Sequence, residues 1–510
     1  MFQQFRAAKL RVIYRPSVCF LAATIASCTP NQAYRDRDSR PWTTAPQTNF
    51  VRGEQLNQYE PFSSKTADHH FDFSYIEFDE KGDYWDRRQL GWTAQEIKKV
   101  AQSHDVVLLV YVHGWQNDAS NLRGHDVPKF HCLLEHLAEA DHFQHRFFGV
   151  YIGWRGKSVP GGDGWFPDNS ALDIASKAIF FVPHELSFYG RKDTATRAAG
   201  LPITEAIFQS VATTRKATQA SGHQSTTILI GHSFGALLLE KALAQALAAK
   251  MISEQGSGGS FTPPADFVVL LNSAAESVYA KEMMDMLRRR SPSSASGPSE
   301  ISARHPLIVS VTSKADWATK MIFPIGTQLS NVFGVFRKYE WDTLYGESSH
   351  NVSQREYFTN TPGHNRHLIS FEALPVSGAP ADPVYEEKDQ CENVMLDAFV
   401  RNLEDPGTGP NGRVRFTTGA SSGKEVQWEL TPTIPEDLMT PYWIVEVPHE
   451  IMRNHSDIFN ENAIALMARL FRVSNPKPAE GIISTSAPRV MRLLEPGQKP
   501  ESDESATPPR

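Results

Sequence analysis

The stretch TTILIGHSFGALLLEKAL, Thr226–Leu243, joins two different patterns through a short turn. Its first half is β-branched and aliphatic, which predicts a strand, and its second half is rich in leucine and alanine, which predicts a helix. Between them, residues 231–235 form the pentapeptide G-H-S-F-G. Ser233 is therefore either a nucleophile at the apex of a strand-to-helix turn or a serine in a turn of small residues.

We favour the nucleophile because this turn has a mechanical explanation. A serine at the apex adopts a strained backbone conformation, and its neighbours two residues away crowd each other, so glycine at Gly231 and Gly235 removes a Cβ clash. The turn directs the serine hydroxyl out of the sheet and places it at a helix amino terminus, which stabilises a developing anion. The backbone N–H of Phe234 is then one candidate donor to an oxyanion.

Other apolar runs alternate with helical patterns along the chain. Strands are predicted at Phe71–Phe78, Val106–Val112, Phe147–Trp154, Thr226–Gly231, Asp266–Asn272, Pro306–Ser313 and Tyr442–Val447. Helices are predicted at Thr93–Gln102 (with Thr93 as N-cap and Glu96 as its capping-box partner), Asp193–Ala220, Gly235–Lys250, Ala280–Arg289 and Glu461–Phe471. Continuously apolar strands alternating with helices predict an α/β fold, a mainly parallel sheet flanked by helices.

A long segment separates the last two predicted strands. Residues 323–439, called the insertion below, carry many Pro, Gly, Asn and His residues and include one possible hairpin, Arg413–Leu430. A connection of this length in a compact domain is usually functional or disordered, so we expect it to cover the site. His364 and His367 lie in it, as weaker candidates for a catalytic base that could instead line the entrance. A second, smaller insertion is predicted from Arg155 to about Arg191.

The strand Val106–Val112 ends in His113-Gly114-Trp115-Gln116-Asn117. The histidine–glycine pair permits a tight loop with an inward N–H group, so the Trp115 backbone is the best candidate for a second oxyanion donor. His113 itself is either a loop-shaping residue or a catalytic base. Its position before the Ser233 turn favours the loop-shaping role.

These two motifs carry a resemblance to a known family. With VHGW as its oxyanion loop and GHSFG as its nucleophile elbow, the sequence resembles an α/β-hydrolase. The segments GVYIGWRG (Gly149–Gly156) and FYGRKDTATRAA (Phe188–Ala199) are similar to those of serine esterase-like hydrolases. The resemblance covers roughly residues 70–330 and 440–470, and it implies the chain order serine, acid, histidine.

That order selects candidates for the other two catalytic roles. Asp316 follows the strand Pro306–Ser313 and is the leading acid, while Glu276 is a weaker alternative and helix capping is a non-catalytic role for Asp316. His449 and His455 both follow the last strand. We favour His455 as the base because it stands on a loop just before a closing helix.

The sequence therefore predicts a serine hydrolase that cleaves an acyl ester, a small molecule or a lipid, through an acyl-enzyme intermediate. No cofactor is expected, and no metal, because the loosely clustered histidines lack ligand spacing: His125, His131, His136, His142 and His145. The net charge of −7 without a basic block argues against nucleic acid as a partner. Alternatives are a non-catalytic envelope protein that binds through this fold, and an acyltransferase.

The amino terminus predicts targeting rather than fold. Basic residues precede a short apolar run, Val18–Ile25, which is too short for a stable membrane span. The sequence Ile25-Ala26-Ser27-Cys28 resembles the bacterial lipobox, which implies lipidation of Cys28 and, with Thr29 next, an outer-membrane anchor facing the periplasm. An ordinary secretory signal is the alternative.

The remaining boundaries follow from composition. Residues 1–28 are the predicted signal peptide, 29–65 a flexible tether, 66–475 the hydrolase domain and 476–510 a disordered tail. With Cys19 removed and Cys28 lipidated, Cys132 and Cys391 remain, and an oxidising periplasm permits a bridge between them.

Overall fold

The computed structural model describes only part of the chain. The described residues are 71–114, 117–119, 126–141, 144–154, 199–255, 262–290, 304–324, 353–378, 413–419, 425–435 and 439–475, with the isolated positions 33, 195, 327, 336 and 402–403. The predicted signal peptide with Cys28, most of the tether, the smaller insertion and the tail lie outside them. None of the described helices is both long and apolar enough to cross a membrane.

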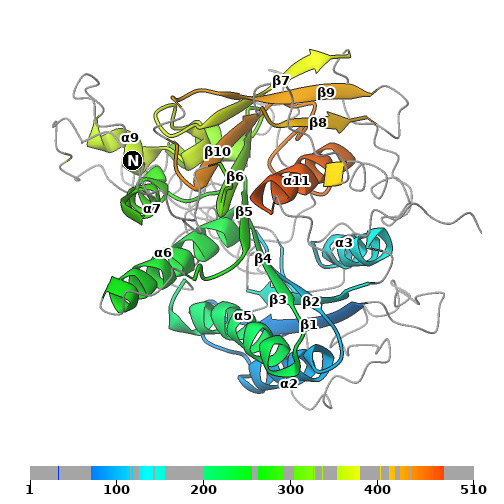
Figure 1. The fold of residues 1–510 in the computed structure, drawn as a ribbon. Helices are drawn as coiled ribbons and strands as arrows, with labels where there is room; N and C mark the ends of the chain where they lie inside the picture. The colour runs from blue at the N-terminus through cyan, green and yellow to red at the C-terminus, as the bar shows by residue number, and fades with distance from the viewer. Residues whose placement is uncertain are drawn as a thin grey trace, which may run out of the picture.

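The described strands form one mixed sheet in the order β1-β3-β2-β4-β5-β6-β10-β7-β9-β8 (Figure 1). Their bounds are β1 (Phe71–Glu77), β2 (Val106–Val112), β3 (Arg146–Gly153), β4 (Ser225–His232), β5 (Phe267–Leu271), β6 (Ile308–Ser313), β7 (Phe371–Ser377), β8 (Arg415–Thr418), β9 (Val426–Pro432) and β10 (Tyr442–Val447). All pairs from β1 to β7 are parallel, and β9 pairs antiparallel with both β7 and β8. The predicted α/β fold with a mainly parallel sheet is confirmed.

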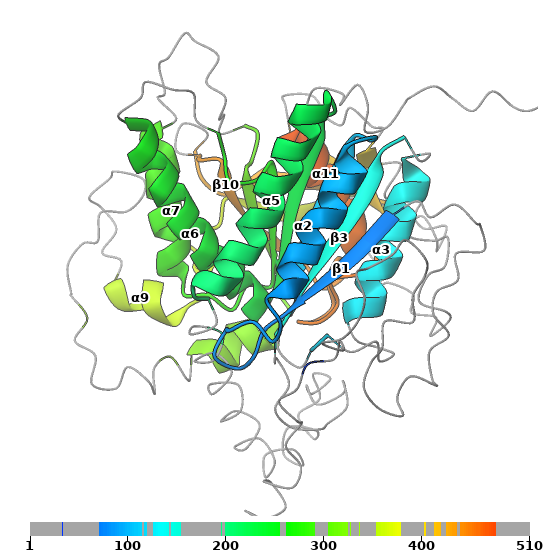
Figure 2. The same cartoon turned by 90° about the horizontal axis from the view of Figure 1, so that it is seen from below.

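Helices cover both faces of this sheet. On one face lie α2 (Arg88–Ala101), α5 (Leu201–Ser221), α6 (Phe234–Gln255) and α7 (Ser277–Arg290), and on the other α3 (Asp126–Ala140) and α11 (Glu461–Ser474) (Figures 1 and 2). The described residues between β6 and β7 include the π-helix η2 (Ala318–Ile322), the α-helix α9 (Gln354–Thr359) and the 3₁₀ helix η3 (Pro362–His364).

Strand β2 shows why the sheet needs cover on both sides. All seven of its residues are buried, and they alternate between two hydrophobic clusters. Val110 and Val112 pack with α5 and α6 on one face, while Leu109 and Tyr111 pack with α3 and α11 on the other. A continuous apolar run is therefore two interleaved faces, as expected of a central parallel strand.

The insertion contributes to the sheet itself. Its hairpin forms at the predicted place, as β8 and β9 within Arg413–Leu430 and two residues beyond. Together with β7, this hairpin extends the sheet past β10.

The predicted capping box at Thr93 is wrong. Helix α2 begins at Arg88, where the Asp86 carboxylate accepts from the Arg88 N–H at 2.9 Å. Thr93 is buried in mid-helix, and its hydroxyl lies 2.5 Å from Ser74 Oγ of β1. Packing against the sheet places this hydroxyl in the interior, so a local capping pattern did not decide where the helix starts.

A buried carboxyl group lies behind the sheet on α6. Glu240 is fully buried, and it accepts hydrogen bonds from the Tyr442 hydroxyl at 2.7 Å and from Ser273 Oγ at 3.3 Å. Burial raises the pKa of Glu240 from 4.5 to about 7, against the opposing effect of these two hydrogen bonds. Between about pH 4.5 and pH 7, the folded protein therefore holds a proton on Glu240 that the unfolded chain releases.

This raised pKa predicts a pH-dependent stability difference. A raised folded-state pKa gives a stabilising contribution that is complete below the unfolded value near 4.5 and is lost as pH rises through about 7. Glu240→Gln removes this titration. The free energy of unfolding of the variant, relative to that of the wild type, should therefore rise by up to about 3 kcal/mol between pH 4.5 and pH 8. Urea unfolding across this range measures the difference, with Glu282→Gln on the exposed face of α7 as control. A difference that does not change with pH would contradict the assignment.

Candidate active site

The predicted catalytic side chains all follow strands at one edge of the sheet. Ser233 follows β4, Asp316 follows β6 and His455 follows β10. These strands run parallel in the order β4-β5-β6-β10, which brings their carboxyl ends to the same edge. Open parallel sheets place ligand-binding residues at this edge. The structure thus brings together three residues that are far apart in the sequence.

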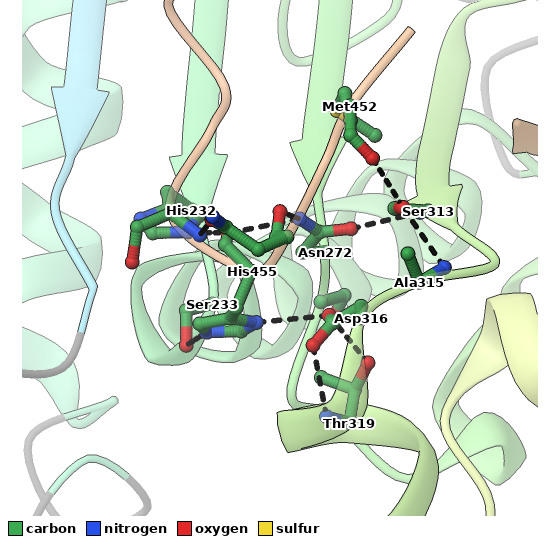
Figure 3. A network of polar contacts seen from close by, with 12 residues as sticks. His232, Ser233, Asn272, Ser313, Ala315, Asp316, Thr319, Met452 and His455 are labelled. Atoms are coloured by element: carbon green, nitrogen blue, oxygen red, sulfur yellow. Dashed lines mark hydrogen bonds and ion pairs between the residues drawn. The ribbon is translucent and has the colours of Figure 1, made fainter. Parts of the chain in front are cut away.

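These residues form one hydrogen-bonded chain (Figure 3). His455 Nε2 lies 2.6 Å from Ser233 Oγ, and His455 Nδ1 lies 2.8 Å from Asp316 Oδ2. All three residues are buried. Both distances are within the range of good hydrogen bonds.

The charge on Asp316 assigns the proton positions. Burial alone would raise the pKa of Asp316, but its interactions with His455 and, to a smaller extent, with His364 and Thr319 together hold this pKa below its usual value. A carboxylate only accepts, so His455 Nδ1 carries a proton, and in the neutral imidazole Nε2 then presents its lone pair to the Ser233 hydroxyl. This arrangement matches a general base directed at a nucleophile.

The turn at Ser233 is strained as predicted, but the crowding at Gly235 comes from the end of β2 and not from Gly231. Ser233 has φ +55°, in the left-handed region that non-glycine residues rarely adopt. A Cβ at Gly231 would lie 2.7 Å from Ala236 Cα, and one at Gly235 would overlap the carbonyl group of Val112. Neither glycine has a positive φ, so glycine is required at both positions because a side chain would not fit, and not because of the backbone conformation.

The loop after β2 lies directly against this turn. A Cβ at Gly114 would lie 2.8 Å from Ser233 Cβ, so glycine allows the loop to reach the serine. Phe234, one predicted oxyanion donor, is the first residue of α6 and is buried. Trp115, the other predicted donor, lies outside the described residues.

The contacts of His113 are consistent with a residue that shapes the loop after β2. Its Nε2 accepts from the Trp154 N–H at 3.0 Å, its Nδ1 lies 2.9 Å from the Gly114 carbonyl, and its ring stacks on Trp154 at 5.5 Å. Both ring nitrogens are therefore engaged by the backbone. Burial lowers the pKa of His113, which keeps the imidazole neutral.

Sequence reasoning missed the residues that hold the His455 backbone. His232 Nε2 and Asn272 Nδ2 each lie 2.9 Å from the His455 carbonyl oxygen, and Asn272 Oδ1 accepts from the Ser313 N–H at 3.0 Å (Figure 3). Asn272 has φ +45°, a conformation in which Asn is enriched. The only local signal is that both residues stand at strand ends beside the predicted site.

The weaker candidates do not reach the serine. His449 is more than half exposed and pairs with Glu450 at 3.1 Å, and His367 lies 3.3 Å from Glu356. Among the described residues, no group of three His, Cys, Asp or Glu side chains could hold a metal, and the predicted candidates His125 and His142 lie outside this part of the chain.

Two further features lie away from the serine. Cys132 is disulfide-bonded, and Cys391, with which the sequence permits a bridge, lies outside the described residues. An apolar cavity lies between α3, α11 and the sheet, lined by residues that include Val107, Ile228 and Phe471. It contains none of the candidate catalytic residues.

Glycine substitutions at a crowded position and at an open position should have opposite effects on stability. Gly235→Ala pushes a methyl group into the backbone of Val112 and His113. Because backbone atoms at the end of β2 cannot move without distorting the sheet, the free energy of unfolding should fall by about 3 kcal/mol. Gly91→Ala, in the exposed part of α2 with nothing within 4 Å, should raise it by about 0.5–1 kcal/mol. Urea unfolding of both variants measures this contrast, and equal stabilities would contradict the packing at the turn.

Comparisons with known proteins add little to this geometry. No protein-family model matches the chain, and no curated protein matches it. An uncharacterized protein from Pseudomonas aeruginosa, known from a crystal structure, has 14% sequence identity and a TM-score of 0.19. That similarity covers 48% of this chain and 41% of the other protein, so the chain spans less than half of its length.

Proposed function

We propose that the protein is a serine hydrolase of the α/β-hydrolase type that cleaves carboxylic esters. The observation that carries the proposal is the chain from Ser233 through His455 to Asp316, with distances of 2.6 and 2.8 Å. Further support comes from the strained turn at Ser233 and from the position of this serine at the amino terminus of α6. A purely structural serine has no need of a buried imidazole–carboxylate pair.

The proposed reaction has two halves. Ser233 Oγ attacks the acyl carbonyl carbon while its proton moves to His455 Nε2, and the carbon–oxygen bond to the alcohol breaks as His455 returns that proton to the leaving oxygen. Water then attacks the acyl-enzyme by the same route in reverse, which releases the acid and restores the serine. Asp316 remains ionised and stabilises the imidazolium that forms in each half.

The transient oxyanion requires donors near the serine. The Phe234 N–H at the start of α6 is our first candidate, and the Trp115 N–H on the loop after Gly114 is the second. An ester is the favoured substrate because an alkoxide leaves more readily than an amine, and the resemblance to esterases points the same way. A small molecule and a lipid ester both fit this chemistry.

Labelling with a fluorophosphonate tests the nucleophile. The wild-type protein should be modified at Ser233 within minutes, because His455 activates this hydroxyl. Ser233→Ala should abolish labelling, and His455→Ala should slow it by about a thousandfold or more. Intact-protein mass spectrometry measures the adduct, and circular dichroism verifies that each variant is folded.

The controls separate this proposal from its alternatives. His449→Ala changes an exposed histidine and should label like the wild type. A correctly folded wild-type protein that resists labelling would favour the non-catalytic binding protein. Esters with a series of acyl lengths, assayed with and without an added alcohol, then distinguish hydrolysis from acyl transfer by the product formed.

We also propose that the chain is lipid-anchored at Cys28 in a bacterial envelope, on the support of its lipobox-like sequence. Cys28→Ala should move the protein from the membrane fraction to the soluble fraction when the full chain is expressed in a bacterium. A Cys19→Ala variant is the matched control, because this cysteine lies within the apolar run and should not affect anchoring. Immunoblots of both fractions measure the outcome, and unchanged membrane association of Cys28→Ala would exclude this anchor.

A further inference from the structure

Asp316 receives hydrogen bonds from a second residue besides His455. Thr319 Oγ1 lies 2.5 Å from Asp316 Oδ2, and the Thr319 N–H donates to Asp316 Oδ1 at 3.2 Å (Figure 3). Asp316 Oδ2 therefore accepts from both His455 Nδ1 and the Thr319 hydroxyl. Thr319 is fully buried, so its hydroxyl contacts a carboxylate in an environment where hydrogen bonds are strong.

The Thr319 hydroxyl has its own donor. His364 Nε2 lies 3.0 Å from Thr319 Oγ1. The hydroxyl has one proton, which it donates in the hydrogen bond to Asp316 because a carboxylate only accepts. His364 Nε2 must therefore be the donor in its contact with the hydroxyl oxygen. A direction is thus assigned to each hydrogen bond, from His364 to Thr319 and from Thr319 to Asp316.

His364 is neutral in this position. Burial lowers its pKa to about 4, with smaller contributions from Asp316, which raises the pKa, and from Lys320 and His455, which lower it. The imidazole therefore carries its one proton on Nε2 at neutral pH. It acts as a neutral donor, and it adds no positive charge that would compete with His455 for the carboxylate.

His364 is held in place by the fold. It ends the 3₁₀ helix η3, where the Gly363 backbone packs so closely on the Thr312 side chain of β6 that no Cβ would fit. The neighbouring Asn365 donates from Nδ2 to Ser277 Oγ of α7 at 2.9 Å. The insertion thus packs against β6, the strand that precedes the acid, and contacts that acid through Thr319.

We propose that Thr319 and His364 are positioning residues for the catalytic acid, so that the working unit is the chain Ser233–His455–Asp316–Thr319–His364. The inference rests on the proposed function. Thr319 orients the carboxylate and shares its charge, and His364 orients and polarises the Thr319 hydroxyl. The insertion consequently has two contributions: its strands β7–β9 extend the sheet, and its residue His364 helps to position the catalytic acid.

Substitution of Thr319 tests the first link. Thr319→Val keeps the shape and removes the hydroxyl, so kcat for an activated ester should fall about tenfold with little change in KM. The acid limb of the kcat/KM profile should move to higher pH. Without the hydrogen bond from Thr319, the Asp316 carboxylate is a stronger base, so the His455–Asp316 pair becomes protonated at a higher pH. Thr319→Ser restores the hydroxyl and should recover most of the rate and the wild-type limb. A loss confined to folding stability, with the limb unmoved, would overturn the role.

Substitution of His364 tests the second link. His364→Leu removes the donor and should lower kcat severalfold, while His364→Gln retains an N–H donor and should lose less. Because His364 acts through the hydroxyl, the double variant Thr319→Val/His364→Leu should be no slower than Thr319→Val alone. Additive losses, or wild-type kinetics in His364→Leu, would overturn the proposed chain.

These outcomes are distinguishable from failure of the proposed function. If folded wild-type protein is neither labelled at Ser233 nor active on esters, the hydrolase proposal fails whatever these variants do. If the wild type is labelled and active while Thr319→Val and His364→Leu behave like it, only this inference fails. Labelling rates of the variants provide a second readout that does not depend on the choice of ester.

Discussion

The site depends on one close approach between two parts of the backbone. Gly235, at the start of α6, packs directly against the carbonyl group of Val112 at the end of β2. Strands β2 and β4 are parallel neighbours, with Val112 beside Gly231, so the two chain segments that leave them share the same space. A side chain at Gly235 would push α6 away from β2 and move the turn that presents Ser233. Glycine at position 235 therefore allows both the Ser233 turn and the loop after β2 to take their observed positions.

The histidine reaches this serine from 222 residues away in the sequence. The structure holds it by its backbone, since His232 and Asn272 both bind the His455 carbonyl oxygen. Both ring nitrogens therefore remain for Ser233 and Asp316. A ring that is oriented in advance needs little rearrangement when charge develops, and this is the condition under which fixed polar groups contribute most to a reaction rate.

The sequence predicted those features that depend on local patterns. The buried strands, the G-x-S-x-G turn and the order of Ser233, Asp316 and His455 follow from periodicity, glycine spacing and chain order. The supports of the site could not be found this way. Asn272 and His364 have no local pattern, because their partners are brought together only by the pairing of strands and by the packing of the insertion. The false capping box has the same origin, since tertiary burial decided the position of that helix.

A second buried histidine and carboxylate lie beside the first pair, and their geometry shows why they do not take its place. His232 Nδ1 is 3.9 Å from Asp126 Oδ2, beyond hydrogen-bond range, and Asp126 instead accepts from the Tyr111 hydroxyl at 2.6 Å. The other nitrogen, His232 Nε2, is occupied by the His455 carbonyl. His232 therefore has no nitrogen directed at the Ser233 hydroxyl, whereas His455 has one nitrogen for the serine and one for a carboxylate. The two histidines therefore have different surroundings: His455 connects the serine to a carboxylate, which our proposed reaction requires, and His232 contacts the backbone of His455.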